Sequence, residues 1–116
     1  MNPVKVLKDG TDYGTWKDNC GLIARNQIAA LGRETPIVPY GIIYNVFCPM
    51  WRKDLSNCFE SVQDALVGAD VIPDDSIKYL KRIAAFYQES QLGFYEIYLC
   101  ESPRDWLNTL ESLTVV

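Results

Sequence analysis

Two groups of polar residues in the second half of the chain have the side-chain types that a phosphodiester-cleaving site requires. The first group contains Arg52, Lys53, Asp54, Ser56 and Asn57. The second group contains Asp74, Asp75, Lys78, Lys81 and Arg82. Carboxylates can hold Mg²⁺, which can neutralise a phosphate and activate a water molecule. The two groups are therefore candidates for one site that holds both a metal ion and a phosphate.

A helix is predicted between the two groups. Apolar residues follow one helical face at Leu55, Phe59, Val62 and Leu66, and Gly68 is suited to end the helix. Asp54 would stand at its N-terminus, where Asp is also a common capping residue. Pro73-Asp74-Asp75-Ser76 is also ordinary turn chemistry. Each acid therefore has a structural explanation by itself, and only the joint order of the two groups indicates a site.

The remaining elements are predicted from changes in hydrophobic period. We expect a short strand at 3–7, a helix from Thr15 to Gly32, and a strand at 37–48 whose early part is bulged or at an edge. Strands at 77–87 and 94–101 are expected to pair as an antiparallel hairpin, and a helix follows at about 102–114. This order predicts one domain, 1–116, with an α+β fold. We expect two layers, with helices packed on a mixed, mostly antiparallel sheet.

The order of these residues resembles the RusA family of Holliday-junction resolvases. That family has Asp-x-Asp-Asn at the start of a helix, Asp-Ala-Leu within it and Asp-Asp after it; here the matching stretches are 54–57, 64–66 and 74–75. Residues 13–19, Tyr-Gly-Thr-Trp-Lys-Asp-Asn, resemble the family's entry into its first helix. Compared with the family, the N-terminal strand region is shortened to residues 1–12, and the helix at about 102–114 is an addition.

The resemblance implies a role for each residue of the site. Asp54 and Asp75 match ligands of Mg²⁺, Asp74 is the neighbouring acid, and Asn57 matches the Asn beside them. Two positions differ from the family.

Ser56 replaces a third carboxylate, and Glu60 stands where the family has a Lys that stabilises the transition state or leaving group. Because Ser56 and Glu60 are four residues apart, they would lie one turn apart on one helix face, so Glu60 could supply the missing carboxylate. Such a site is expected to tolerate Mn²⁺, which also favours oxygen ligands.

The charge of the chain is unusual for a DNA-binding protein. The net charge is −4, whereas affinity for DNA comes mainly from Lys and Arg. Five of the 11 basic residues are clustered beside the acids: Arg52, Lys53, Lys78, Lys81 and Arg82. These five predict a DNA-facing rim around the carboxylates. The alternative is that they are the solvated ends of a helix and a strand.

Cysteine spacing and hydropathy exclude several other classes. The chain has no His, and its four Cys residues form no CxxC pair, so we expect neither zinc nor His-based catalysis. No apolar run approaches the roughly 18 residues of a membrane span. We therefore expect no membrane segment and a cytoplasmic location.

Two functions remain open. The first is a Mg²⁺-dependent, structure-selective endonuclease acting on four-way DNA junctions in recombination and repair. The resemblance implies that it would be a homodimer in which each subunit nicks one strand, with Phe94, Tyr95 and Trp106 as candidate interface residues. The second is a catalytically degenerate relative that binds DNA or a protein partner, which the acidic pI of about 4.7 and the changes at Ser56 and Glu60 favour.

Overall fold

A computed structural model describes residues 3–7, 13–48, 55–91 and 93–114. The strands are β1 (Val4–Leu7), β2 (Gly41–Cys48), β3 (Ile83–Glu89) and β4 (Phe94–Cys100). The helices are α1 (Tyr13–Ala30), α2 (Leu55–Gly68) and α3 (Pro103–Thr114). The order of helices and strands along the chain agrees with the sequence prediction.

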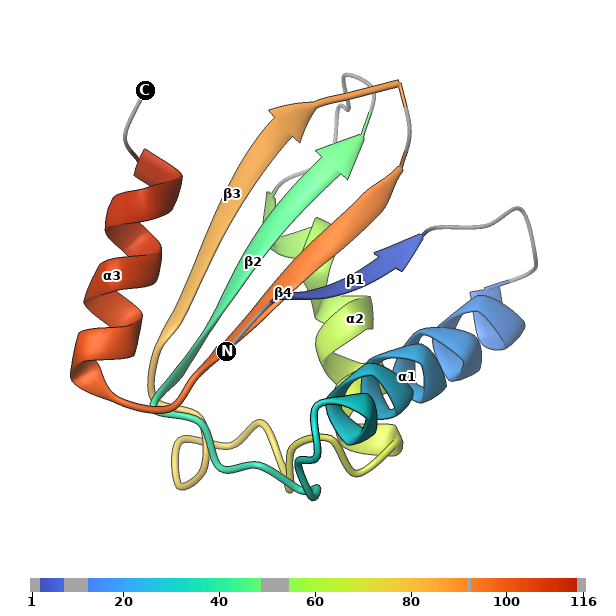
Figure 1. Ribbon diagram of the computed structural model, residues 1–116. Coiled ribbons are helices and arrows are strands. Elements are labelled where there is room, and N and C mark those ends of the chain that lie inside the picture. Colours follow the sequence, from blue (N-terminus) through green and yellow to red (C-terminus); the bar gives the residue numbers. More distant parts are fainter. Residues whose placement is uncertain (1–2, 8–12, 49–54, 92, 115–116) are drawn as a thin grey trace.

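The four strands form one sheet in the order β1-β4-β2-β3 (Figure 1). β4 pairs antiparallel with both β1 and β2, whereas β2 and β3 are parallel. The predicted α+β class with a mixed, mostly antiparallel sheet is confirmed. Parallel pairing of β2 and β3 requires a crossover connection, which α2 provides.

Helices α1 and α2 cover one face of the sheet, here called the core face. Side chains from β2, such as Ile42, Tyr44 and Val46, join Leu66 of α2 and Ile28 of α1 in one buried cluster. Tyr95, which was expected to serve a dimer interface, is also in this cluster and is only 4% exposed. That prediction is wrong for Tyr95, because its position on β4 directs the side chain into the core.

The two core helices pack closely at Gly21. A Cβ atom at this position would lie 2.7 Å from both the Ala65 carbonyl oxygen and the Ala69 Cβ atom. Small residues on both helices therefore set the distance between α1 and α2.

Both core helices end in the same hydrogen-bonded turn. After α1, Gly32 has a φ of 74°, Gly32 N donates to Ala29 O, and Arg33 N donates to Ile28 O. This is the Schellman pattern. After α2, the corresponding left-handed residue is Asp70, with a φ of 57°. Gly68, which was expected to close α2, is its last helical residue instead.

Two predicted strands begin later than expected. The segment before Gly41 contains Pro39, which has no N–H for a sheet ladder, so it stays outside the sheet. β2, which begins at Gly41, is a central strand between β4 and β3, not an edge strand. The segment before Ile83 forms a turn instead, in which Tyr79 N and Leu80 N both donate to Ser76 O.

The predicted hairpin between the last two strands is wrong. β3 and β4 are separated by β2, and the chain crosses the end of β2, where Ser90 N donates to Cys48 O at 2.9 Å. Crossing one strand requires about 10 Å, which a four-residue connection can span. The crossover through α2 places β3 on the side of β2 that β4 does not occupy. The short polar connection between β3 and β4 therefore does not make these two strands neighbours.

Helix α3 lies on the opposite face of the sheet, here called the second face. Its start has the expected cap: Asp105 N donates to Ser102 Oγ, and Glu101 N donates to Asp105 Oδ2. A Cβ atom at Gly41 would lie 2.5 Å from the ring of Trp106. Since Gly41 alternates with the core residue Ile42, Trp106 contacts the second face. The predicted two layers are therefore the sheet and the helices α1 and α2. Helix α3 was expected in the same helical layer but packs on the opposite face of the sheet.

Candidate nucleic-acid interface

Three of the predicted DNA-binding residues line one pocket at the start of β2 and β3. The pocket has a volume of about 180 Å³ and lies between segments 38–40 and 78–82. Its lining consists of Val38, Pro39, Tyr40, Lys78, Tyr79, Lys81 and Arg82. Three of these seven residues are cationic and none is acidic, so the pocket carries a local positive charge in a chain of net charge −4.

Arg82 is held in place by its contacts with Tyr40. The Arg82 guanidinium lies over the Tyr40 ring, 3.8 Å from its centroid, and Nη1 donates to the Tyr40 carbonyl oxygen at 3.3 Å. Trp106 packs edge-on against the same tyrosine, with ring centroids 6.3 Å apart. The cation–π contact and the hydrogen bond together fix the orientation of the guanidinium before a ligand arrives.

The two lysines of the pocket are presented by a short turn. Lys78 and Lys81 are exposed, and the Lys78 Nζ atom lies 5.1 Å from the centroid of the Tyr79 ring. Leu80, between them, is 5% exposed and belongs to the core cluster. The buried leucine therefore anchors a turn whose flanking cations face solvent.

Cations around tyrosine rings are suited to a nucleic-acid backbone. Lys and Arg side chains bind phosphate oxygens, and exposed aromatic rings can stack on bases. Tyr40 and Tyr79 were missed in the sequence prediction. Tyr79 lies within the basic segment Lys78-Tyr79-Leu80-Lys81-Arg82, and this position next to the cations is the signal that could have identified it. Tyr40 is far from these residues in sequence and carries no such signal.

The predicted metal-site residues lie at both ends of α2. Ser56 and Asn57 are in its first turn, and Glu60 is exposed one turn further on. Asp74 and Asp75 follow the other end of the helix, and Asp75 N donates to Asp74 Oδ1 at 2.8 Å. After burial and the Cys20 charge, the charges of Asp75 and Asp64 raise the pKa of Tyr44, so both carboxylates lie within electrostatic range of that hydroxyl. Arg52, Lys53 and Asp54 lie outside the described residues.

The described residues contain no group of three or more His, Cys, Asp or Glu side chains that could hold a metal ion. We derive no catalytic step from the acids that can be placed.

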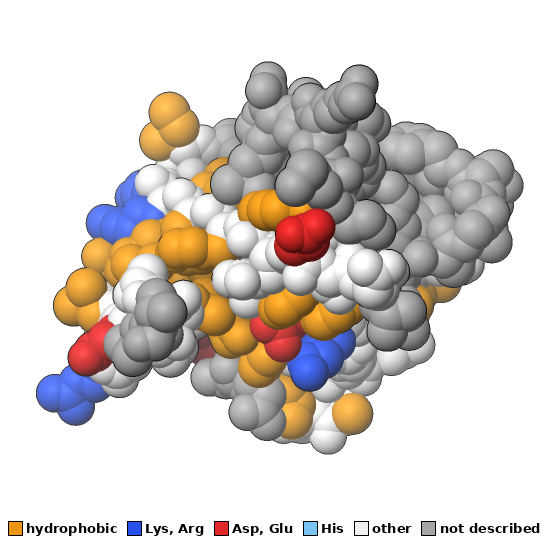
Figure 2. Space-filling model, turned by 90° about the horizontal axis from the view of Figure 1, so that it is seen from above, with side chains coloured by type: hydrophobic (Ala, Val, Ile, Leu, Met, Phe, Trp, Pro, Cys, Tyr) orange, Lys and Arg blue, Asp and Glu red, His pale blue; other side chains and the backbone are white. Residues whose placement is uncertain are grey.

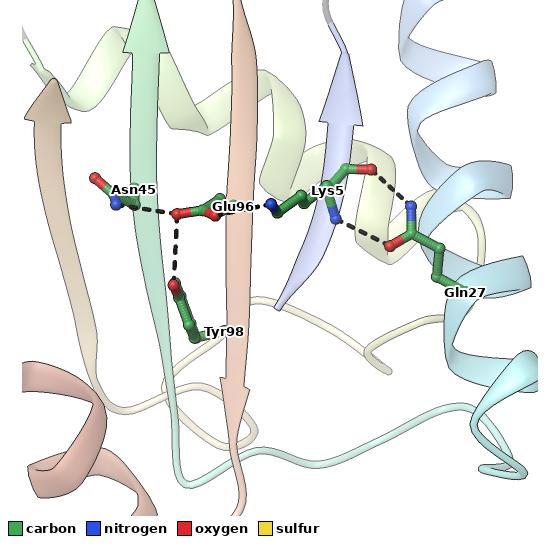
Figure 3. Close-up of polar contacts among 5 residues, drawn as sticks. All are labelled: Lys5, Gln27, Asn45, Glu96 and Tyr98. Carbon is green, nitrogen blue, oxygen red and sulfur yellow. Dashed lines mark hydrogen bonds and ion pairs between the residues drawn. The ribbon is translucent and has the colours of Figure 1, made fainter. Parts of the chain in front are cut away.

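A second polar cluster lies on the second face of the sheet and was not anticipated (Figure 3). Glu96 of β4 accepts hydrogen bonds from Asn45 Nδ2 at 3.2 Å and from the Tyr98 hydroxyl at 3.4 Å. Its other oxygen lies 3.5 Å from Lys5 Nζ. Burial, and then the Glu96 charge, raise the pKa of Tyr98. Because these side chains come from three adjacent strands, the cluster favours the observed register of β1, β4 and β2.

Cys20, Cys48 and Cys100 are all buried thiols. Burial raises the pKa of Cys20 to about 12, so its thiol is protonated and unreactive at neutral pH. Within the described residues, none of the helices combines the length and the apolar character needed to cross a membrane.

The chain matches no model of a known protein family, and no curated protein has a significantly similar sequence.

Proposed function

We propose that this protein is a RusA-like protein that binds branched DNA, with the four-way junction as its substrate. The observation that carries the proposal is the convergence of Lys78, Lys81 and Arg82 on one pocket with Tyr40. The three cations were selected from sequence as DNA contacts, and their placement around one pocket is what a phosphate-binding surface needs.

The pocket predicts a specific salt dependence. Each cation that neutralises a phosphate releases counterions, so the slope of log K against log salt changes by about 0.9 per contact. Three contacts in each subunit would give a slope of about 2.7 per subunit. The acidic net charge of the chain repels DNA, so binding is favoured where cations are clustered, as in this pocket.

Removal of the exposed lysines tests DNA binding. The double variant Lys78→Ala/Lys81→Ala should weaken junction binding and flatten the salt slope by about 1.8, because two phosphate contacts are lost. Arg25→Ala is the matched control, since Arg25 is exposed on α1, away from the pocket. Equal effects of both changes would mean that the chain binds DNA through overall charge, or not through this pocket.

Mg²⁺-dependent nicking of the junction is the second candidate function. It is favoured by the sequence order of Asp54, Asn57, Asp74 and Asp75, and by the exposure of Glu60 one helical turn from Ser56. Mg²⁺, or Mn²⁺ in its place, would supply charge neutralisation and an activated water molecule. If the protein does not cleave DNA, it is a catalytically degenerate member of this type that uses the same surface to bind junctions.

A junction-cleavage assay decides between these two functions. An active protein should nick a four-way junction in Mg²⁺ or Mn²⁺, and Asp54→Asn should abolish nicking without loss of DNA binding. Glu60→Gln should lower the metal response if Glu60 replaces the carboxylate missing at Ser56. In a degenerate protein, Ser56→Asp combined with Glu60→Lys should create cleavage. No cleavage by any of these proteins would leave binding alone as the function.

We propose that the protein acts as a homodimer, because two symmetric nicks require two related sites. Light scattering at micromolar concentration should give twice the mass of the 13.2 kDa chain. A monomer mass would remove the dimeric resolvase hypothesis while leaving DNA binding open.

A further inference from the structure

The two edges of the sheet differ in how they are protected. At the β1 edge, the side chain of Gln27 from α1 binds the backbone of Lys5: Oε1 accepts from Lys5 N at 3.0 Å, and Nε2 donates to Lys5 O at 2.6 Å (Figure 3). At the other edge, β3 pairs only with β2 among the described strands. Its sequence Ile-Ala-Ala-Phe-Tyr-Gln-Glu contains no Lys or Pro, the residues that commonly prevent edge pairing.

Hydrogen bonding defines which residues of β3 direct their backbone groups outward. Ile42 N donates to Arg82 O, and the crossing segment donates from Ser90 N to Cys48 O, so even-numbered residues face β2. Because direction alternates along a strand, Ile83, Ala85 and Glu89 direct their N–H and C=O groups away from β2. These positions can form a new antiparallel ladder.

We propose that β3 pairs antiparallel with β3 of a second copy of this chain, with Ala85 opposite Ala85. This inference specifies the interface of the dimer that is part of the proposed function. Since both members of each hydrogen-bonded pair must point outward, odd residues must face odd residues. A two-fold axis at Ala85 meets this condition and joins the two sheets into one of eight strands.

This register makes the strand complementary to itself. Lys81, just before β3, stands opposite Glu89 of the second copy, which gives two opposite-charge pairs. Ile83 stands opposite Tyr87, and Ala84 opposite Phe86, so each larger side chain meets a smaller or aliphatic one. The basic end of each copy's strand thus lies beside the acidic end of the other copy's strand, and the apolar residues between them carry no charge.

Exposed apolar side chains surround the proposed interface. Ile83 is 43% exposed and Tyr87 is 39% exposed, and no residue of α3 is buried. Figure 2 shows hydrophobic side chains gathered on the left, which is the side where β3 and α3 lie in Figure 1. An added strand would extend the sheet toward α3 and remove part of this apolar surface from water.

The pairing would also fix the distance between the two basic pockets. Lys81 lies eight residues along the ladder from Lys81 of the second copy, which corresponds to about 26 Å. A symmetric pair of phosphate-binding pockets at constant spacing suits a substrate with two-fold symmetry.

A charge swap tests the register. Glu89→Lys would place two ammonium groups against each other at both ends of the ladder, because position 89 faces Lys81 of the second copy. It should raise the dimer dissociation constant at least tenfold in sedimentation. The double variant Lys81→Glu/Glu89→Lys should restore dimerisation, because the opposite charges then meet in reversed order. Within one chain the two residues are about 26 Å apart, so rescue can only occur between chains.

Engineered disulfides provide an independent measurement. Ala85→Cys should form a disulfide-linked dimer on mild oxidation, since paired Cα atoms about 5.5 Å apart suit a disulfide. Gln88→Cys is the matched control on the same strand, where the two Cα atoms would be about 20 Å apart. Equal cross-linking of the two variants, or a dimer unaffected by Glu89→Lys, would overturn the β3 interface. A monomeric wild-type chain would overturn the dimer itself. DNA binding is then tested separately by Lys78→Ala alone, because Lys78 lines the pocket but lies outside the paired segment 81–89.

Discussion

Two tyrosines on opposite faces of the sheet show how differently the faces are built. Tyr44 points to the core face, is fully buried, stacks on Phe59 at 4.9 Å, and donates to Gln63 Oε1 at 3.0 Å. Tyr98 points to the second face, is partly exposed, and its hydroxyl lies 3.4 Å from Glu96. The core face thus holds its polar groups in closed pairs, whereas the second face uses charged groups that reach solvent.

This difference separates the face that contributes most to stability from the face that supports the proposed binding pocket. The core face carries most of the buried apolar side chains and therefore most of the hydrophobic stabilisation. The second face holds α3, whose Trp106 supports Tyr40 of the basic pocket. Asn45 Oδ1 on this face is buried and accepts no hydrogen bond within the described part of the chain. An unsatisfied buried acceptor is a cost, so the second face is the less optimised of the two.

Truncation on the core face should give the largest loss of stability. Leu66 is completely buried in α2, and Leu66→Ala removes buried methyl groups and leaves a cavity. We expect a loss of about 2–5 kcal/mol in the free energy of unfolding, measured by urea denaturation. Leu107→Ala on α3 is the control, because Leu107 is 63% exposed, and it should change stability by less than about 0.5 kcal/mol. Similar losses for both would contradict the assignment of the core.

A charge placed on the second face should destabilise the protein in a pH-dependent way. In Asn45→Asp, a carboxylate at a position 3% exposed would face Glu96, so burial and like charge would raise its pKa in the folded state. A raised folded pKa means that stability is retained below the unfolded pKa of about 3.9 and is lost as pH rises. We expect a loss of about 3 kcal/mol at pH 7 that shrinks toward pH 4. The control Asn26→Asp, at an exposed position of α1, should show no such dependence.

The sequence predicted the elements well because local signals define them. The apolar period of α2 and the Ser102 cap of α3 depend on neighbouring residues only, and both elements are where they were expected. Strand pairing depends on residues distant in sequence. The hairpin was predicted from the short connection at 89–93, but the crossover through α2 decides which strand lies beside β3.

The candidate site was predictable only in part, for the same reason. Lys78, Lys81 and Arg82 were identified as a cluster because they are close in sequence, and they line one pocket. Tyr40 could not be identified, because its contact with Arg82 spans 42 residues. The carboxylates were grouped by a family pattern, and the order of residues in that pattern does not by itself fix the distances between their side chains in the fold.

Displacing α3 from the second face should have an intermediate effect. Gly41→Ala would bring a Cβ atom to 2.5 Å from the Trp106 ring and 3.0 Å from Arg82 Cβ, so the helix or the strand must move. We expect a loss of about 1–3 kcal/mol and a change in tryptophan fluorescence. Gly68→Ala in α2, where a Cβ meets nothing within 4 Å, should instead be neutral or stabilising by up to about 1 kcal/mol. An unchanged protein with Gly41→Ala would mean that Trp106 does not pack on β2.

The smallest effects are expected at the two tyrosines at neutral pH, and they should separate at alkaline pH. Tyr44→Phe removes one buried hydrogen bond and should cost about 1 kcal/mol at pH 7, whereas Tyr98→Phe removes a longer bond and should cost less. Burial raises the pKa of Tyr44 well above its ordinary value of 10, and burial followed by the Glu96 charge raises that of Tyr98. Both tyrosines therefore favour the neutral form in the folded state.

The sign of the alkaline effect follows from these pKa shifts. A folded pKa above the unfolded pKa gives stability that is complete below pH 10 and is lost as pH rises, by up to about 1.4 kcal/mol per pH unit for each group. Cys20 contributes with the same sign above pH 9, but it is present in both variants, so it cancels in their comparison. Stability measured from pH 8 to 11.5 should fall less steeply in Tyr44→Phe than in Tyr98→Phe. Equal slopes would show that the hydroxyl of Tyr44 reaches solvent, and the contrast between a closed core face and an open second face would then not hold.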